Sequence, residues 1–145
     1  MTLDALVEFA GRNPMLSLAF VGLTLALIYT EIARLMRGFK GLSPAQLTEW
    51  INRENAVVID IRGQGEFEKG HIAGSKHQLP SQFDPEAKWL VKAKEQPVVV
   101  VCATGMTAGG VAARLVKAGY QRVAVLEGGI AAWQQASLPL TAGRA

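Results

Sequence analysis

The hydrophobic pattern of the chain starts with a short mixed segment followed by a long apolar one. Residues 1–12 are weakly amphipathic, and Asn13-Pro14 is typical of a helix start. Residues 15–30 form a run of 16 positions without a charge. As a helix this run covers about 24 Å, and apolar residues between 32 and 36 extend it toward the ~30 Å of a hydrocarbon core. We therefore predict one transmembrane helix, spanning about residues 14–33.

The flanks of this segment indicate its type and orientation. A buried core helix or a cleaved signal would be the alternatives, but the segment is apolar on all faces and lacks a basic region at its start. Three basic residues between 34 and 40 follow the span, whereas only Arg12 precedes it. Basic flanks stay in the cytoplasm, so we expect a single-pass membrane protein with its N-terminus outside and the following domain in the cytoplasm. Residues 1–37 are then the anchor and 38–41 a short tether.

From residue 42 onward, strand and helix signals alternate. Near-continuous apolar runs at 56–61, 97–101 and 122–126 are typical of strands buried on both faces, and 76–79 is a further short strand. Helical segments are expected at 43–52, 66–69, from 84 through Trp89 and Val91, after Cys102 up to 118, and at 129–136. Trp50, Trp89 and Trp133 are interpreted as core aromatics. The alternation predicts an α/β domain over residues 42–140, a central parallel sheet with helices on both faces, and a tail at 141–145.

Composition narrows the classes of function. With 145 residues, half of them apolar, the chain fits one globular domain and an appendage. The net charge of +3 comes from dispersed basic residues, which argues against nucleic acid as a partner. The single cysteine excludes an internal disulfide, and with two isolated histidines, His71 and His77, we expect no metal site.

The single cysteine falls where a strand turns into a helix. Cys102 directly follows the run at 97–101, and small residues open the helix after it. Unpaired backbone N–H groups and the helix dipole favour an anion at such a turn, so the thiol should ionise easily. The alternative is a buried cysteine that only fills space. Ligands of parallel sheets bind at this carboxyl edge, which favours a reactive role.

Three stretches of the chain form an ordered set of motifs. The first combines Asp60-Ile-Arg62 with Glu66-Phe-Glu-Lys-Gly-His-Ile-Ala-Gly74, the second is Val98 to Cys102 with Gly105, and the third runs from Gly119-Tyr120 through Gly128-Gly129 to Trp133. In this order and spacing they resemble the motifs of the rhodanese-like family. Together they cover about residues 42–140. With the anchor added, the chain is most similar to short membrane-tethered bacterial members.

The resemblance implies sulfur transfer through a persulfide on Cys102, without a cofactor. The implied persulfide-binding loop consists of Ala103, Thr104, Gly105, Met106, Thr107 and Ala108. Asp60 and Arg62 stand at the carboxyl end of the strand at 56–61, close to where this loop should lie, and we expect them to form a structural hydrogen-bonded pair that supports it. The six residues 102–107 match the sulfurtransferase form of the loop, whereas related phosphatases have seven and end in arginine. The expected partners are a sulfur donor, either thiosulfate or a protein persulfide, and a thiol acceptor.

One departure from the family pattern keeps a second function open. Active members often carry a basic residue in the loop, whereas this chain has Met106 and, at the last position, Thr107. Losing a charged anchor for an anion would cost about 1.5–3 kcal/mol, which disfavours thiosulfate. The alternative is a non-catalytic rhodanese module whose anchor, besides contacting membrane lipid, recruits it to a membrane-protein partner. A redox-sensing thiol is a third reading.

Overall fold

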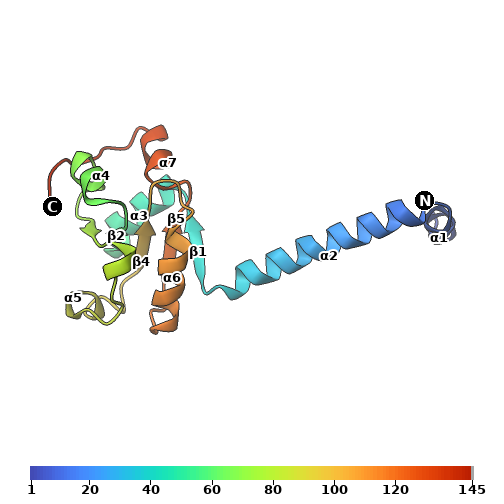
Figure 1. Ribbon diagram of the computed structural model, residues 1–145, viewed down its shortest axis with the longest axis horizontal. Helices are drawn as coiled ribbons and strands as arrows, with labels where there is room; N and C mark the ends of the chain where they lie inside the picture. The colour runs from blue at the N-terminus through green and yellow to red at the C-terminus, as the bar shows by residue number, and fades with distance from the viewer. Residues whose placement is uncertain (145) are drawn as a thin grey trace. The chain divides into compact units, whose positions relative to one another are not determined.

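The computed structural model describes residues 1–144, which form two compact units, Met1–Arg37 and the residues from Gly38 onward (Figure 1). The first unit consists of α1 (Leu3–Arg12) and α2 (Pro14–Met36). Asn13 between them has non-helical backbone angles, φ −128° and ψ 64°. Because Pro14 also lacks the N–H that would continue the first helix, one helix ends and another begins here.

Helix α2 extends over 23 residues, slightly more than the predicted span. None of its residues is buried within the protein. Its length and apolar composition are sufficient to cross a membrane.

The second unit is built on a five-stranded sheet in the order β1-β5-β4-β2-β3, with all strands parallel. The strands are β1 (Phe39–Leu42), β2 (Val57–Asp60), β3 (Lys76–His77), β4 (Val98–Val101) and β5 (Val123–Leu126). The predicted α/β class with a central parallel sheet is confirmed.

Helices cover both faces of this sheet (Figure 1). They are α3 (Pro44–Glu54), α4 (Gln64–Lys69), the 3-10 turn η1 (Pro80–Gln82), α5 (Lys88–Val91), α6 (Ala108–Lys117) and α7 (Gly129–Gln135). Successive residues of β4 point to opposite faces. Val98 and Val100 pack with α6, whereas Val99 and Val101 pack with residues of α3 and α7. The two cores therefore fix β4 from both sides and leave its carboxyl end at the edge of the domain.

The prediction of a short tether at residues 38–41 is wrong for three of these four residues. Residues 39–41 belong to β1, which pairs with β5 from Phe39 opposite Val123 to Leu42 opposite Leu126. Strand β1 thus begins three residues after Met36 ends α2. The chain passes from the long helix directly into the sheet.

The helix expected to start at Asp84-Pro85 is also shorter than predicted. The side chain of Asp84 accepts a hydrogen bond from the N–H of Glu86 at 2.9 Å and forms a local turn, so the helix begins only at Lys88. Trp89 is 37% exposed and is not a core residue, in contrast to Trp133. Trp50 is only partly buried.

Candidate active site

Cys102 lies at the carboxyl edge of the sheet, immediately after β4. The four valines of β4 are completely buried, and Cys102 itself is 2% exposed. Asp60 is opposite Val101 in the neighbouring strand, and the N–H of Ile61 donates to the carbonyl of Val101 at 2.9 Å. The end of β2 and the cysteine turn are therefore held side by side.

The loop after Cys102 closes around its sulfur atom. The N–H of Gly105 donates to Sγ at 2.9 Å. The hydroxyl of Thr107 and the N–H groups of Ala108 and Thr107 also act on the thiol group and lower its pKa. Donors that point at one sulfur stabilise its anion, and the start of α6 adds the positive end of a helix dipole.

Two opposing influences act on the pKa of Cys102. Burial is the largest single influence and raises it, because a buried thiolate loses its hydration. The Thr107 hydroxyl and the backbone donors of Ala108, Thr107 and Gly105 lower it, and together they outweigh burial. The resulting pKa is below the ordinary value of a cysteine, which favours the thiolate, the nucleophilic form.

The outer side of the same loop is open to solvent. Ala103, Thr104, Met106 and Thr107 are exposed, and Met106 is 89% exposed. None of the residues from Ala103 to Ala108 carries a charge. The sulfur is therefore surrounded by hydrogen-bond donors and dipoles, with an apolar side chain at the tip of the loop.

The start of α7 is hydrogen-bonded to the start of the cysteine loop. The N–H of Ile130 donates to the carbonyl of Cys102 at 2.9 Å, and the N–H of Ala131 donates to that of Ala103 at 3.2 Å. Gly129 has φ +60°, and a Cβ there would collide with the backbone of Cys102 and Ala103. Gly128, also at positive φ, precedes it.

Sequence reasoning missed this supporting role. The motif comparison identifies Gly128-Gly129 only as part of a family pattern, although two glycines between a strand and a helix are a signal of close backbone approach. Gly105 has a similar constraint, because at φ +92° its Cβ would lie 3.0 Å from the N atom of Gly128. The glycines of the two loops therefore meet.

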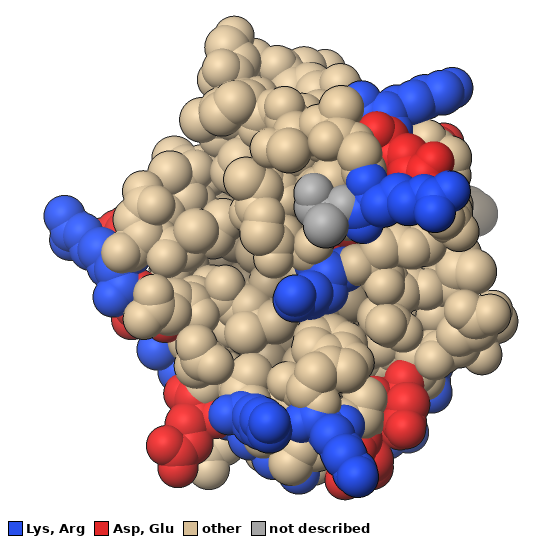
Figure 2. Space-filling model, turned by 90° about the vertical axis from the view of Figure 1, so that its left-hand side faces the viewer, with Lys and Arg blue, Asp and Glu red and all other residues tan. Residues whose placement is uncertain are grey.

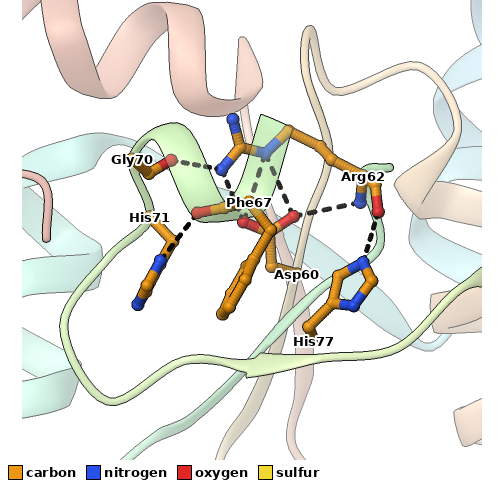
Figure 3. Close-up of polar contacts among 6 residues, drawn as sticks. All are labelled: Asp60, Arg62, Phe67, Gly70, His71 and His77. Atoms are coloured by element: carbon orange, nitrogen blue, oxygen red, sulfur yellow. Dashed lines mark hydrogen bonds and ion pairs between the residues drawn. The ribbon is translucent and has the colours of Figure 1, made fainter. Parts of the chain in front are cut away.

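The predicted pair of Asp60 and Arg62 is present and buried (Figure 3). Their side chains are 1% and 8% exposed, and the guanidinium donates to the carboxylate at 3.1 Å from Nε and 2.8 Å from Nη2. Nη2 also donates to the carbonyl of Gly70 at 2.6 Å. The pair thus connects the end of β2 to the end of α4, and no hydrogen bond or ion pair between it and the cysteine loop is observed within residues 1–144.

Both histidines lie in the structure that surrounds this pair (Figure 3). His71 is buried and stacks on Phe67 with ring centroids 3.8 Å apart, and its Nδ1 lies 2.8 Å from the carbonyl of Phe67. Nε2 of His77 lies 2.6 Å from the carbonyl of Arg62. These contacts are typical of structural histidines, and they give His77 a partner that the sequence did not suggest.

A family model for the rhodanese-like domain matches residues 43–136 of the chain. The chain belongs to the rhodanese-like family. The matched range includes the cysteine loop, the pair of Asp60 and Arg62, and both glycines at the start of α7.

Relatives of this rhodanese-like protein include sulfurtransferases and a protein that matches nearly the whole chain. The chain is 39% identical over 143 residues to the Escherichia coli (strain K12) protein YibN, covering 98% of this chain and 100% of that protein. It is 36% identical over 98 residues to the thiosulfate sulfurtransferase GlpE of Pseudoalteromonas translucida, covering 68% of this chain and 91% of that enzyme.

Among solved structures, the thiosulfate sulfurtransferase from Pseudomonas aeruginosa superposes with a TM-score of 0.66 at 26% identity, covering 74% of this chain and 20% of that one. The match to GlpE covers about the length of the second unit, whereas the match to YibN covers the helical N-terminal unit as well.

Proposed function

We propose that this rhodanese-like protein is a sulfurtransferase that carries sulfane sulfur as a persulfide on Cys102. The observation that supports the proposal most strongly is the group of donors around Sγ, from Gly105, Thr107 and Ala108, which lower the pKa of the thiol. The same donors can hold the terminal sulfur of a persulfide, which is also an anion. The named sulfurtransferases among its relatives agree with this chemistry.

The proposed reaction consists of two displacements. In the first, the Cys102 thiolate attacks the outer sulfur of the donor and a new S–S bond forms. The old bond of the donor breaks, and its electron pair leaves with sulfite or with a thiolate. In the second, an acceptor thiolate attacks the outer sulfur of the persulfide, and the Cys102 thiolate leaves. Because the sulfur is held covalently between the two steps, the kinetics are ping-pong.

The charge around the loop favours a persulfide donor over thiosulfate. Thiosulfate carries two negative charges and a persulfide only one, while residues 103–108 offer no cation. Arg62, which the sheet places at this edge, is engaged by Asp60 and Gly70. Figure 2 shows that basic side chains on the face it presents are dispersed rather than gathered around one site. Backbone dipoles alone suit the singly charged donor better.

We further propose that α2 anchors the protein in the bacterial inner membrane, with the rhodanese-like domain in the cytoplasm. Support comes from the length and composition of α2 and from the basic residues between 34 and 40. β1 begins three residues after α2 ends, so the domain would work close to the membrane surface. Anchoring of this kind would favour a sulfur donor or acceptor at that surface.

The second candidate is a non-catalytic module that binds a membrane-protein partner. It is favoured by Met106, an apolar side chain that is 89% exposed at the tip of a loop without charge. Exposed methionines adapt easily to apolar surfaces of partner proteins.

Steady-state kinetics separate the two functions. With glutathione persulfide as donor and a small thiol as acceptor, the sulfurtransferase gives parallel double-reciprocal lines, and Cys102→Ser abolishes turnover. A pure binding module shows no turnover in either form and binds its partner equally well with and without Cys102.

A further inference from the structure

Helix α1 carries an apolar stripe that nothing in its own unit covers. The stripe consists of Leu3, Leu6, Val7 and Phe9, each between 49% and 76% exposed. The other side of the helix carries Asp4, Glu8 and Arg12, and the last two form an ion pair at 2.6 Å. No residue of α1 is buried. A helix with one bare apolar side and one charged side requires a boundary between apolar and aqueous surroundings.

The corner between α1 and α2 is fixed by hydrogen bonds. The side chain of Asn13 donates to the carbonyl of Phe9 at 3.0 Å, and the hydroxyl of Ser17 in α2 donates to the carbonyl of Ala10 at 3.3 Å. These bonds satisfy carbonyl groups at the end of α1 that have no partner within the helix. In Figure 1, α1 is seen end-on where α2 lies in the plane of the picture, so the two axes cross steeply.

We propose that α1 lies flat in the lipid–water interface, with its apolar stripe in the bilayer and its charged side in water. The inference rests on the proposed function of α2 as a membrane span. When α2 runs across the bilayer, a helix that crosses its axis lies along the surface. One residue, Asn13, separates the two helices, so the membrane span holds the end of α1 at the lipid–water boundary. Binding of α1 to the lipid surface is then intramolecular, and even a small apolar area suffices for it.

A lipid surface fits the stripe better than a second copy of the chain. Ten residues with one row of large apolar side chains offer far less area than the ~1,200 Å² of a stable protein interface. Two carboxylates and one guanidinium on the charged side give no attraction to anionic headgroups. Apolar contact therefore drives the binding, which should not depend on the content of anionic lipid.

Nitroxide labels on single cysteines test the proposal in the full chain. In a Cys102→Ser background, a cysteine replaces Leu6, Glu8 or Leu25, and the labelled protein is placed in phosphatidylcholine vesicles with and without phosphatidylglycerol. Leu6 and Glu8 lie on opposite sides of α1, and Leu25 lies near the middle of α2. Collision with oxygen reports contact with lipid, and collision with a water-soluble nickel chelate reports contact with water.

The expected result is a several-fold higher ratio of oxygen to nickel collisions at Leu6→Cys than at Glu8→Cys, the same in both lipid mixtures. Equal ratios at these two sites, or protection of Leu6→Cys that is lost on dilution into excess lipid, would overturn the proposal, and the second result would indicate pairing of two copies. Leu25→Cys keeps the two proposals apart. If Leu25→Cys reports a position deep in the bilayer while the two α1 sites give equal collision ratios, only the placement of α1 is wrong. If Leu25→Cys is exposed to water, α2 does not span the membrane.

Discussion

At the residue scale, the chemistry depends on the groups that surround one sulfur atom. Burial raises the pKa of Cys102, whereas the hydroxyl of Thr107 and three backbone N–H groups lower it by a larger total. Backbone donors cannot be removed by simple substitution, but the hydroxyl can. Thr107 therefore gives the most direct access to the electrostatics of the site.

Replacing Thr107 with alanine should raise the pKa of Cys102. Alkylation requires the thiolate, so its rate increases as the pH rises through the pKa, and a higher pKa moves this increase to higher pH. One hydrogen bond to a charged group contributes about 1.5 kcal/mol, so the rate near pH 7 should fall about tenfold. The rate of iodoacetamide alkylation, measured against pH on the only cysteine of the chain, checks this.

Thr107→Ser keeps the hydroxyl and is the matched control, with a profile close to that of the original protein. If Thr107→Ala has the same pH profile as Thr107→Ser, the side chain does not contribute to the acidity of Cys102.

Placing a cation at Met106 should change the choice of donor. Met106 is exposed and its side chain can be exchanged without affecting the core. In Met106→Arg a guanidinium can bind the sulfonate end of thiosulfate, and a charged hydrogen bond of about 1.5 kcal/mol or more predicts at least a tenfold higher kcat/KM for this donor. The gain for glutathione persulfide should be smaller. Met106→Gln, which is polar without charge, is the control, and an equal gain from both variants would show that charge is not the deciding property.

At the scale of elements, the cysteine loop depends on the helix that starts beside it. Gly129 faces the backbone of Cys102 and Ala103 and has a positive φ, so Gly129→Ala forces a collision in a strained conformation. We expect a loss of about 1–3 kcal/mol in the free energy of unfolding. Urea unfolding of the full chain in detergent measures it.

Gly110→Ala is the comparison for this variant. Gly110 lies within α6, has open space where a Cβ would stand and has no positive φ, so alanine should leave stability equal or raise it by up to about 1 kcal/mol. Equal urea midpoints for Gly129→Ala and Gly110→Ala would show that the contact between the two loops does not contribute to the fold.

Sequence patterns predicted well those elements that are buried among apolar neighbours on both faces. The valine run of β4 is buried on both faces, so its composition alone indicated a central strand and placed Cys102 at its end. β1 was missed because Phe39-Lys-Gly-Leu has no such pattern and is a strand only through pairing with β5, more than 80 residues later. The contact of Gly129 with the Cys102 loop is also between distant segments. Local patterns carry no information about such pairs.

At the scale of the whole molecule, the proposed topology places the two ends of α2 on opposite sides of the membrane. In a Cys102→Ser background, Gly11→Cys before α2 and Gln121→Cys in the rhodanese-like domain are both exposed positions. A membrane-impermeant maleimide should label Gly11→Cys in spheroplasts and label Gln121→Cys only after lysis. Labelling of Gln121→Cys before lysis would place the domain outside, against the proposed orientation.

The most direct test of the central proposal is the mass of the intact full-length protein after exposure to glutathione persulfide. A sulfur carrier gains the mass of one sulfur atom, the gain is absent from Cys102→Ser, and an added thiol removes it. If the fully reduced protein gains no mass, or if Cys102→Ser gains as much, Cys102 does not carry sulfur and the rhodanese-like domain does not act as a sulfurtransferase.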